Sequence, residues 1–338
     1  MIEIELDEPR WHAFVTSQAD ALPFHHPSWA RVLTECYGFR GFALALVGAE
    51  KEVVAGVPIV QVSHPFGDLR WISLPFTDSC PPLGSAAYRN GLAAELEEAR
   101  KGAGAAALEV RGFLRGATVD PTVDAVKHSL SLHQDAEAVA ERFTPAVRRN
   151  VRSALRNRLR LHWGDSLRDI SETYYSLHVQ TRRRLGLPAQ PRRLFRLLWP
   201  HVLEPGNGFV VLAYHGSTAV AGAVFLSWNG TVIFKYGASD PSFWRLRPNN
   251  LIFSEAIRWA CSAGYHTFDF GRTAVSDVGV RRFKLGWGTV EQPLRYTILG
   301  GVKRKLPGRA NPVVRGAIKC APPWVTRIIG ELFYKYEA

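Results

Sequence analysis

The sequence predicts a mixed α/β (α+β) protein built from two related units, each a mixed, mostly antiparallel sheet flanked by helices. The chain has 338 residues, a length that suggests two domains. Hydrophobic residues make up 46% of it, enough to form a core in each domain. The same series of strands and one helix occurs in both halves. Matching elements of the two halves are separated by about 167 residues at the start of the series and by about 162 at its end. This nearly constant separation indicates a duplication.

The first-half series follows a helix with clear end signals. Pro27 stands at its first position and Gly38 at its stop. Apolar runs then alternate with turn residues, such as the charged turn at 49–52. The predicted elements are strands at 42–48, 53–62 and 69–75, a helix at 86–101 and a strand at 105–110.

The second-half series has the same order. Asn229 and Gly230 form a strong type I′ turn signal between two of its strands. Its helix has Pro248 in the first turn and Gly264 as its C-terminal stop. The predicted elements are strands at 209–214, 218–228 and 231–238, a helix at 248–264 and a strand at 267–270.

Two helices precede the second series. Thr144 followed by Pro145 marks the start of the first, which is predicted over 146–161. Its apolar residues fall on one face and its arginines on the other. The apolar face consists of Val147, Val151, Leu155 and Leu159, and the basic face of Arg149, Arg152, Arg156 and Arg160. The second helix ends at Gly186.

The chain is expected to divide into three parts. Residues 1–135 form the first unit, 136–300 the second unit with the expected active site, and 301–338 a helical tail. The tail contains four prolines and ends in an amphipathic pattern, so it should pack against a domain. That pattern runs through Trp324, Ile328, Ile329, Leu332 and Phe333. Its basic and aromatic residues also suit a peripheral membrane contact, an alternative that stays open here.

The composition limits the partners and the compartment. A formal net charge of +12 indicates an anionic partner such as RNA, a phosphorylated cofactor or a membrane surface, unless it only reflects an arginine-rich composition. No apolar run approaches the ~20 residues of a membrane-spanning helix. The first residues are acidic where a secretory signal would be basic and then apolar. We therefore expect a soluble, cytoplasmic protein.

A metal site is not expected. The four cysteines have no paired spacing, which argues against a disulfide framework and against a thiolate zinc site. The eleven histidines show no HExxH pattern or similar ligand spacing. Any chemistry should therefore come from the side chains and from the substrates.

The string TRRRLG at 181–186 is the most distinctive in the sequence. Guanidinium groups such as those of Arg182 and Arg183 can bind a carboxylate or phosphate with two parallel hydrogen bonds. The alternative is structural, because cations at the end of a helix favourably oppose the negative end of its dipole. Residue patterns alone leave both interpretations open.

Two further strings could line a binding site. In KYGASD (235–240), Tyr236 could present its hydroxyl at a strand edge, although an ordinary strand end is the simpler interpretation. In RPNN (247–250), Asn249 lies where a helix start offers free backbone N–H groups to phosphate or carboxylate. A simple helix cap is the alternative for Asn249.

The strings FDFGRT (268–273) and FKLGWG (283–288) contain the remaining candidates. Lys284 stands between Phe283 and Leu285, so its ammonium should be partly desolvated and a strong donor for a developing oxyanion or a phosphate. Asp269 and Arg272 come from the preceding strand. The alternative is that Lys284 is one of many surface lysines.

Taken in order, these strings resemble the FemABX-related branch of the GNAT acyltransferase superfamily. HPSW (26–29), YG (37–38) and SLPFTD (73–78) in the first half agree with it, and the resemblance covers about residues 25–298. It implies two GNAT-like folds, with a C-terminal segment that returns to the first unit. The best-understood members transfer an amino acid from aminoacyl-tRNA to an amine, which forms a peptide bond.

The resemblance also implies residue roles. Lys284 matches a position that stabilises the tetrahedral oxyanion or contacts the RNA 3′ end. Arg182 or Arg183 matches an arginine that holds an anionic group of the acceptor, and Tyr236 matches an aromatic position lining the cleft. Substrate binding is further expected of Asp269, Arg272, Phe283 and Asn249, and RNA binding of Arg149, Arg152, Arg156 and Arg160.

Two departures bear on the donor. The sequence lacks the inserted coiled-coil arm of longer members, and it has no Arg/Gln-x-x-Gly-x-Gly/Ala pyrophosphate loop of the kind that acetyl-CoA-binding GNATs use. We therefore expect an aminoacyl-tRNA donor and an amine acceptor from a peptidoglycan precursor, a natural product or a small molecule. No cofactor beyond this co-substrate and no DNA partner are expected. The alternatives are an acyl-CoA-dependent N-acyltransferase and a non-catalytic RNA- or membrane-associated module.

Overall fold

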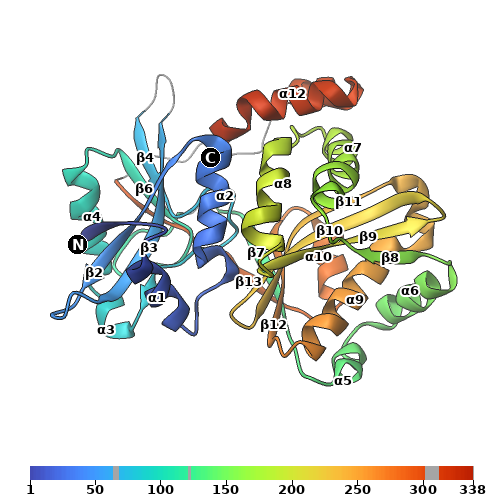
Figure 1. Ribbon diagram of the computed structural model, residues 1–338, viewed down its shortest axis with the longest axis horizontal. Helices are drawn as coiled ribbons and strands as arrows, with labels where there is room; N and C mark the ends of the chain where they lie inside the picture. The colour runs from blue at the N-terminus through green and yellow to red at the C-terminus, as the bar shows by residue number, and fades with distance from the viewer. Residues whose placement is uncertain (64–67, 121–122, 301–311, 338) are drawn as a thin grey trace. The chain divides into compact units, whose positions relative to one another are not determined.

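The computed structural model describes residues 1–63, 68–120, 123–300 and 312–337 (Figure 1). The chain forms two compact units. The first contains Met1–Ala125 and Pro293–Leu306, and the second contains Val126–Gln292 and Pro307–Glu337. The boundary near Ala125 lies about ten residues before the expected one at 135.

The first unit is a seven-stranded sheet in the order β1-β2-β3-β4-β6-β14, with β5 paired to β3. The predicted helix at 86–101 is two helices, because Asn90 and Gly91 interrupt it. The strands are β1 (Ile2–Glu5), β2 (Arg40–Val47), β3 (Val53–Ser63), β4 (Leu69–Ile72), β5 (Leu83–Gly84), β6 (Ala107–Val110) and β14 (Thr297–Leu299). The helices are α1 (Pro9–Ser17), η1 (Pro23–His25), α2 (Pro27–Tyr37), α3 (Ala86–Arg89) and α4 (Leu92–Gly102).

The second unit is a seven-stranded sheet in the order β13-β7-β12-β11-β10-β9-β8. The strands are β7 (Ala125–Ser131), β8 (Arg160–Trp163), β9 (Gly208–His215), β10 (Thr218–Trp228), β11 (Thr231–Ser239), β12 (Thr267–Ala274) and β13 (Val290–Pro293). The helices are α5 (Ala136–Glu141), α6 (Pro145–Arg156), η2 (Asp169–Tyr174), α7 (Tyr175–Leu185), α8 (Arg192–Leu198), η3 (Trp199–Leu203), η4 (Pro241–Leu246), α9 (Pro248–Ser262), α10 (Val278–Leu285), α11 (Pro312–Cys320), α12 (Pro323–Phe333) and η5 (Tyr334–Glu337). In the described part of the chain, none of the helices has both the length and the hydropathy that crossing a membrane requires.

The predicted duplication is confirmed by the strand pairing. In the first unit, β2, β3 and β4 are antiparallel, and after α4 the chain returns in β6, which is parallel to β4. In the second unit, β9, β10 and β11 are antiparallel, and after α9 the chain returns in β12, parallel to β11. Each sheet is therefore mixed and mostly antiparallel, as expected.

Helices cover both faces of the second sheet. α6 and α9 lie on one face and α7 on the other (Figure 1). The core under α6 and α9 is aromatic, and the fully buried ring of Trp287 lies 5.0 Å from Phe143 and 5.8 Å from Phe253, measured between ring centroids. Trp287 belongs to the string FKLGWG, so this string holds the segment after α10 against the core.

The helix predicted over 146–161 is shorter than expected. α6 ends at Arg156, because Arg158 adopts a left-handed backbone conformation (φ 53°) that a helix cannot continue through. Arg160 instead belongs to β8, which gains backbone hydrogen bonds by pairing with β9. The buried face of α6 contains Val147 and Ala154, whereas Leu155 of the predicted apolar face is 59% exposed.

The tail belongs to the second unit, so the prediction that it packs on the first unit is corrected. Its helices α11 and α12 contact α7. The Arg183 Nε atom donates a hydrogen bond of 2.5 Å to the carbonyl oxygen of Ala321. Gly330 permits this packing, because a side chain there would collide with the backbone of Ala189. The segment that does join the first unit is β14, which pairs with β6.

Candidate active site

The parallel strands β11 and β12 separate towards their carboxyl ends. Their pairing covers Thr231–Ile233 and Thr267–Asp269, although β11 continues to Ser239 and β12 to Ala274. Ligands of α/β sheets commonly bind beyond the carboxyl ends of parallel strands. The separation therefore marks this end of the second sheet as the candidate site.

A bulge in β11 accounts for the separation. On the β10 side, Val224 pairs with Tyr236 and Phe225 pairs with Phe234, so Lys235 is an extra residue in β11. Such a bulge bends its strand and increases the local twist, which turns β11 away from β12. Tyr236 follows the bulge directly. Its side chain is buried, with its ring centroid 5.5 Å from that of Phe195 in α8.

A kink in β12 brings two of the singled-out strings together. Gly271 has a left-handed backbone (φ 71°), and its N–H donates a 2.7 Å hydrogen bond to the Asp269 carboxylate. The carbonyl oxygens of Gly271 and Arg272 accept hydrogen bonds from the Lys284 ammonium at 2.9 and 3.2 Å. Glycine is needed at the kink because other residues adopt this conformation at a cost. Asp269 therefore shapes the strand, and Lys284 joins α10 to it.

Lys284 is a buried cation at this kink. Its side chain is only 4% exposed, consistent with the expected desolvation between Phe283 and Leu285. Two backbone dipoles point their negative ends at the ammonium, which stabilises a charge that burial would otherwise disfavour. A preorganised cation of this kind is suited to stabilise negative charge that develops during a reaction.

A titratable pair next to Lys284 had no signal in the sequence. The His128 Nε2 atom, on β7, lies 3.0 Å from a carboxylate oxygen of Glu291, which also accepts two hydrogen bonds from Arg281. Burial is the main cause that lowers the pKa of His128, and the Lys284 charge acts in the same direction. His128 therefore resists protonation, and both it and Arg281 face the Glu291 carboxylate.

A cavity of about 770 Å³ lies between α6, α9 and α10. Asn250, in the first turn of α9, is 7% exposed, and no hydrogen bond of its side chain occurs within the described residues. Phe283 forms an apolar wall and packs against Phe253 of α9 with ring centroids 5.7 Å apart. The lining residues are Thr144, Ala146, Val147, Asn150, Asn250, Val278, Gly279, Arg281, Arg282, Phe283, Leu285 and Gly286.

The helix start at RPNN offers fewer donors than the sequence suggested. Pro248 has no N–H, and the N–H groups of Asn250 and Leu251 both donate to the carbonyl oxygen of Arg247. Arg247 can accept both because its left-handed backbone (φ 62°) turns its carbonyl towards the helix. In the described structure, only the N–H of Asn249 in this turn has no intrachain partner, so the expected group of free donors is corrected to one.

Three of the four predicted RNA-binding arginines form an open basic face. Arg149, Arg152 and Arg156 lie on α6 with exposed side chains, and within the described residues none of them forms an ion pair. Arg160 is separated from them by the end of the helix, and its guanidinium stacks over the Tyr214 ring at 4.8 Å. The first turns of α6 line the cavity, so the basic face and the cavity share a helix.

The arginines of TRRRLG form hydrogen bonds to backbone carbonyl groups or stack on an aromatic ring. Arg182 donates a 2.9 Å hydrogen bond to the carbonyl oxygen of Pro188, and Arg183 donates to Ala321 in the tail. The Arg184 guanidinium stacks over the Trp244 ring at 4.8 Å. None of these arginines lines the cavity between α6, α9 and α10, and neither Lys284 nor Tyr236 lines it. Their contacts favour the structural interpretation of this string. Arg272, which belongs to the string FDFGRT, is exposed at the end of β12.

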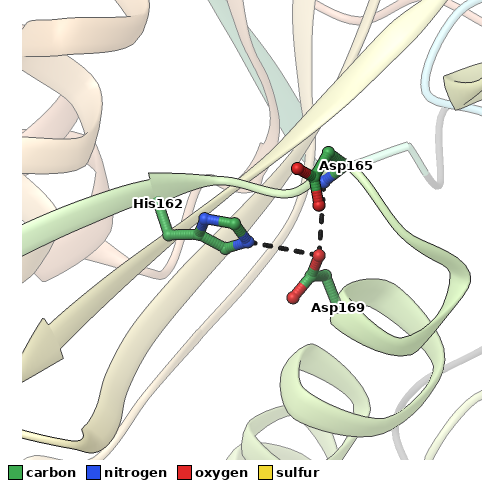
Figure 2. A group of neighbouring side chains, drawn as sticks. All are labelled: His162, Asp165 and Asp169. Atoms are coloured by element: carbon green, nitrogen blue, oxygen red, sulfur yellow. Dashed lines mark hydrogen bonds and ion pairs between the residues drawn. The ribbon is translucent and has the colours of Figure 1, made fainter.

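One cluster has donor types that metals use. Figure 2 shows His162, Asp165 and Asp169 next to one another, with ligand atoms all within 4.8 Å. Asp169 Oδ2 already accepts hydrogen bonds from His162 (3.2 Å), the Ser166 hydroxyl (2.6 Å) and the Asp165 N–H (3.2 Å). Burial raises the pKa of Asp169, but these hydrogen bonds outweigh it and hold the pKa below its usual range. Asp169 therefore acts as a hydrogen-bonded junction between β8 and η2.

Comparison with known proteins matches part of the chain to a domain family. Residues 141–285, from the end of α5 to α10, match the family model described as an acetyltransferase (GNAT) domain. A search of curated proteins gives no match. The matched segment contains the basic face of α6, Lys284 and all of the cavity-lining residues except Gly286.

Solved structures with the same fold cover both units. FemX is 16% identical and covers 89% of this chain and 98% of its own, with a TM-score of 0.71. L-PGS from Bacillus licheniformis is 14% identical and covers 98% and 99%, with a TM-score of 0.58. A tandem GNAT protein from the clavulanic acid biosynthesis pathway is 10% identical and covers 88% and 96%, with a TM-score of 0.53. At these identities the similarity establishes the fold.

Proposed function

Residues 141–285 are a GNAT domain within a chain that has the tandem GNAT fold, and from this premise we propose that the protein is an amide-forming aminoacyltransferase. Its donor is an aminoacyl-tRNA, and its acceptor is an amine of a peptidoglycan precursor, a natural product or a small molecule. An aminoacyl ester is already activated. Positioning the two substrates and stabilising the oxyanion can therefore supply most of the acceleration.

The basic face of α6 is the observation that best supports an RNA donor. Arg149 and Arg156 are seven residues apart on the helix, which is about 10 Å along its axis, close to three axial phosphate spacings on one strand. These arginines have no carboxylate partner in the described structure. The same helix begins at the cavity, so an RNA strand following the arginines would bring its 3′ end to Asn150 and Asn250.

Lys284 takes the electrostatic role in this proposal. Its ammonium is fixed by the carbonyl oxygens of Gly271 and Arg272, so its position needs no reorganisation when charge develops on the substrate. The attacking amine reaches the ester carbonyl from the opening between β11 and β12. A covalent enzyme intermediate is not required.

An acyl-CoA donor fits this site less well. Pyrophosphate binding at a helix start uses several backbone N–H groups that point at the ligand. Within the part of the chain that the structure describes, the start of α9 presents only the N–H of Asn249, because Pro248 has none and Asn250 bonds to Arg247. The first turn also lacks a glycine that would let a pyrophosphate approach the backbone.

Binding of tRNA across a range of salt concentrations tests the donor. The wild-type protein should bind tRNA with an affinity that falls steeply with salt. The double variant Arg149→Ala/Arg152→Ala should bind more weakly, with a log–log salt slope reduced by about one for each lost phosphate contact. Arg160→Ala should stay near wild type, because Arg160 stacks on Tyr214 outside this face.

A matched control is available on α8. Arg193 and Arg196 are exposed and form no ion pair within the described residues, so Arg193→Ala/Arg196→Ala removes the same charge from another surface. Equal losses in both double variants, or a flat salt response, would count against the α6 face. Tight binding of CoA without any effect of tRNA would replace this proposal with the acyl-CoA donor.

Transfer activity tests Lys284 separately. With labelled aminoacyl-tRNA and a panel of amines, Lys284→Met should reduce kcat by about 10²–10³-fold, the range found when one oxyanion donor is removed. The Michaelis constants should change little. Full activity of a folded Lys284→Met variant would remove Lys284 from the mechanism.

A further inference from the structure

Helix α12 presents apolar side chains to solvent. Trp324 and Leu332 are each 58% exposed, and Ile328 and Phe333 are exposed as well. Trp324, Ile328 and Leu332 are spaced by four residues, so they form one line along the helix. Contiguous exposed apolar side chains of this size are uncommon on soluble proteins and mark interaction surfaces.

Packing fixes which face of α12 is outward. Thr326 and Gly330 lie on the opposite side and are buried against the segment that follows α7. The carbonyl oxygen of Thr326 accepts a hydrogen bond from the Ala189 N–H at 3.4 Å, and Gly330 lets the two backbones approach. The helix is therefore held in a defined orientation that exposes its apolar line.

The surroundings of this line have the chemistry of a membrane interface. Between residues 315 and 337 the tail has four cations, Arg315, Lys319, Arg327 and Lys335, against two carboxylates. Trp324 lies near one end of α12, and Tyr336 follows its other end with the Lys335 ammonium 5.0 Å from its ring centroid. Tryptophan and tyrosine suit the level of lipid headgroups, and cations are attracted by anionic lipids.

The exposed area argues against a second protein as the occupant. The four apolar side chains expose roughly 400 Å², about half of the ~800 Å² per partner that a stable protein interface buries. Shallow insertion into a bilayer has no such requirement, because each apolar side chain gains free energy independently.

We propose that α12 docks this protein on an anionic membrane surface. Trp324, Ile328 and Leu332 insert at the boundary between headgroups and acyl chains, while the tail cations contact lipid phosphates. The docking is peripheral, and it requires neither the tRNA donor nor the transfer reaction. It would bring an acyltransferase to substrates located at a membrane.

Flotation with lipid vesicles tests the docking with the full chain. The wild-type protein should float with vesicles of phosphatidylcholine and phosphatidylglycerol, and less with phosphatidylcholine alone. The double variant Ile328→Ser/Leu332→Ser should bind about ten-fold more weakly per residue changed. Leu155→Ser is the matched control, because Leu155 is as exposed as Leu332 but lies on α6.

Three outcomes would overturn the proposal. One is that the wild-type protein does not bind anionic vesicles. Another is that the double variant binds as well as wild type, which would assign vesicle binding to other cations such as those of α6. The third is a dimer in sedimentation velocity that the double variant dissociates while vesicle binding is absent, which would make this face an interface between copies. Circular dichroism should show both variants folded, because the changed side chains are exposed.

Discussion

The side-chain ammonium of Lys284 donates a 2.9 Å hydrogen bond to the carbonyl oxygen of Gly271, at the point where β12 has left its parallel partner β11. This bond links two residues that are thirteen positions apart in the sequence, and it joins α10 to the kinked end of the strand. Gly271 makes the kink possible, and Lys284 compensates the carbonyl groups that the kink turns out of the sheet.

Lys284→Met should lower the free energy of unfolding by about 1–3 kcal/mol, because two carbonyl oxygens lose their buried donor. Urea denaturation monitored by tryptophan fluorescence measures this loss. The control is Arg282→Ala on the same helix, which should stay within about 0.5 kcal/mol of wild type because Arg282 is exposed. Equal stability of Lys284→Met and wild type would show that these hydrogen bonds do not hold α10.

Asn250→Leu should separate binding from stability. The Asn250 side chain is buried and forms no hydrogen bond within the described residues, so an apolar replacement should leave the free energy of unfolding within about 0.5 kcal/mol of wild type. Donor binding should fall about ten-fold or more if the amide contacts the donor in the cavity. If Asn250→Leu bound tRNA as tightly as wild type, the 3′ end of the tRNA would not contact Asn250.

Gly330→Ala should loosen the tail. An added Cβ would lie 1.6 Å from the carbonyl oxygen of Ala189, so α12 must move away from the segment after α7. Hydrogen exchange should become faster in α12, while α9 stays protected. Gly316→Ala on α11 is the control, because a Cβ there meets no atom within 4 Å. Unchanged exchange in Gly330→Ala would contradict this packing of the tail.

Acidification should destabilise the second unit through His178. Burial, with the Arg182 charge as a further cause, lowers the pKa of His178 from 6.5 to about 3. A depressed folded pKa means that the unfolded chain takes up the proton first. The contribution of His178 to stability is therefore complete above pH 6.5 and is lost as the pH falls towards 3.

The expected loss from this residue is about 2 kcal/mol at about pH 5. Urea unfolding at pH 7 and pH 5 should show a correspondingly smaller loss for His178→Gln, which has no titrating group. The other buried histidines affect both proteins alike, so the difference isolates His178. The same acid sensitivity in both proteins would show that His178 does not titrate in this range.

Helix ends and the order of elements were predictable from the sequence. Gly38 and Gly186 end α2 and α7 in the left-handed conformation, as their positions indicated. Pro248 opens α9, and Asn229 and Gly230 join β10 to β11. These signals are local, because capping and turn formation involve only a few successive residues. The offset between the halves then revealed the duplication.

The end of α6 and the place of the tail were not predictable in this way. The arginine spacing continues to Arg160, yet strand pairing with β9 removes that residue from the helix. The tail pattern correctly indicated an apolar face. It did not indicate that the opposite face packs on Ala189, where Gly330 allows the two backbones to approach. Such choices depend on partners that are distant in the sequence.

The strings of the second half identified where chemistry is expected, because each combines residue types with a definite turn or cap. Only the tertiary structure brought Asn150, Asn250 and Arg282 to one cavity, from three separate helices. It also decided that Arg182 and Arg183 hold backbone carbonyl groups, and that Arg247 uses the N–H groups expected to be free. Which polar groups remain unsatisfied is determined by long-range packing, and local sequence patterns do not encode it.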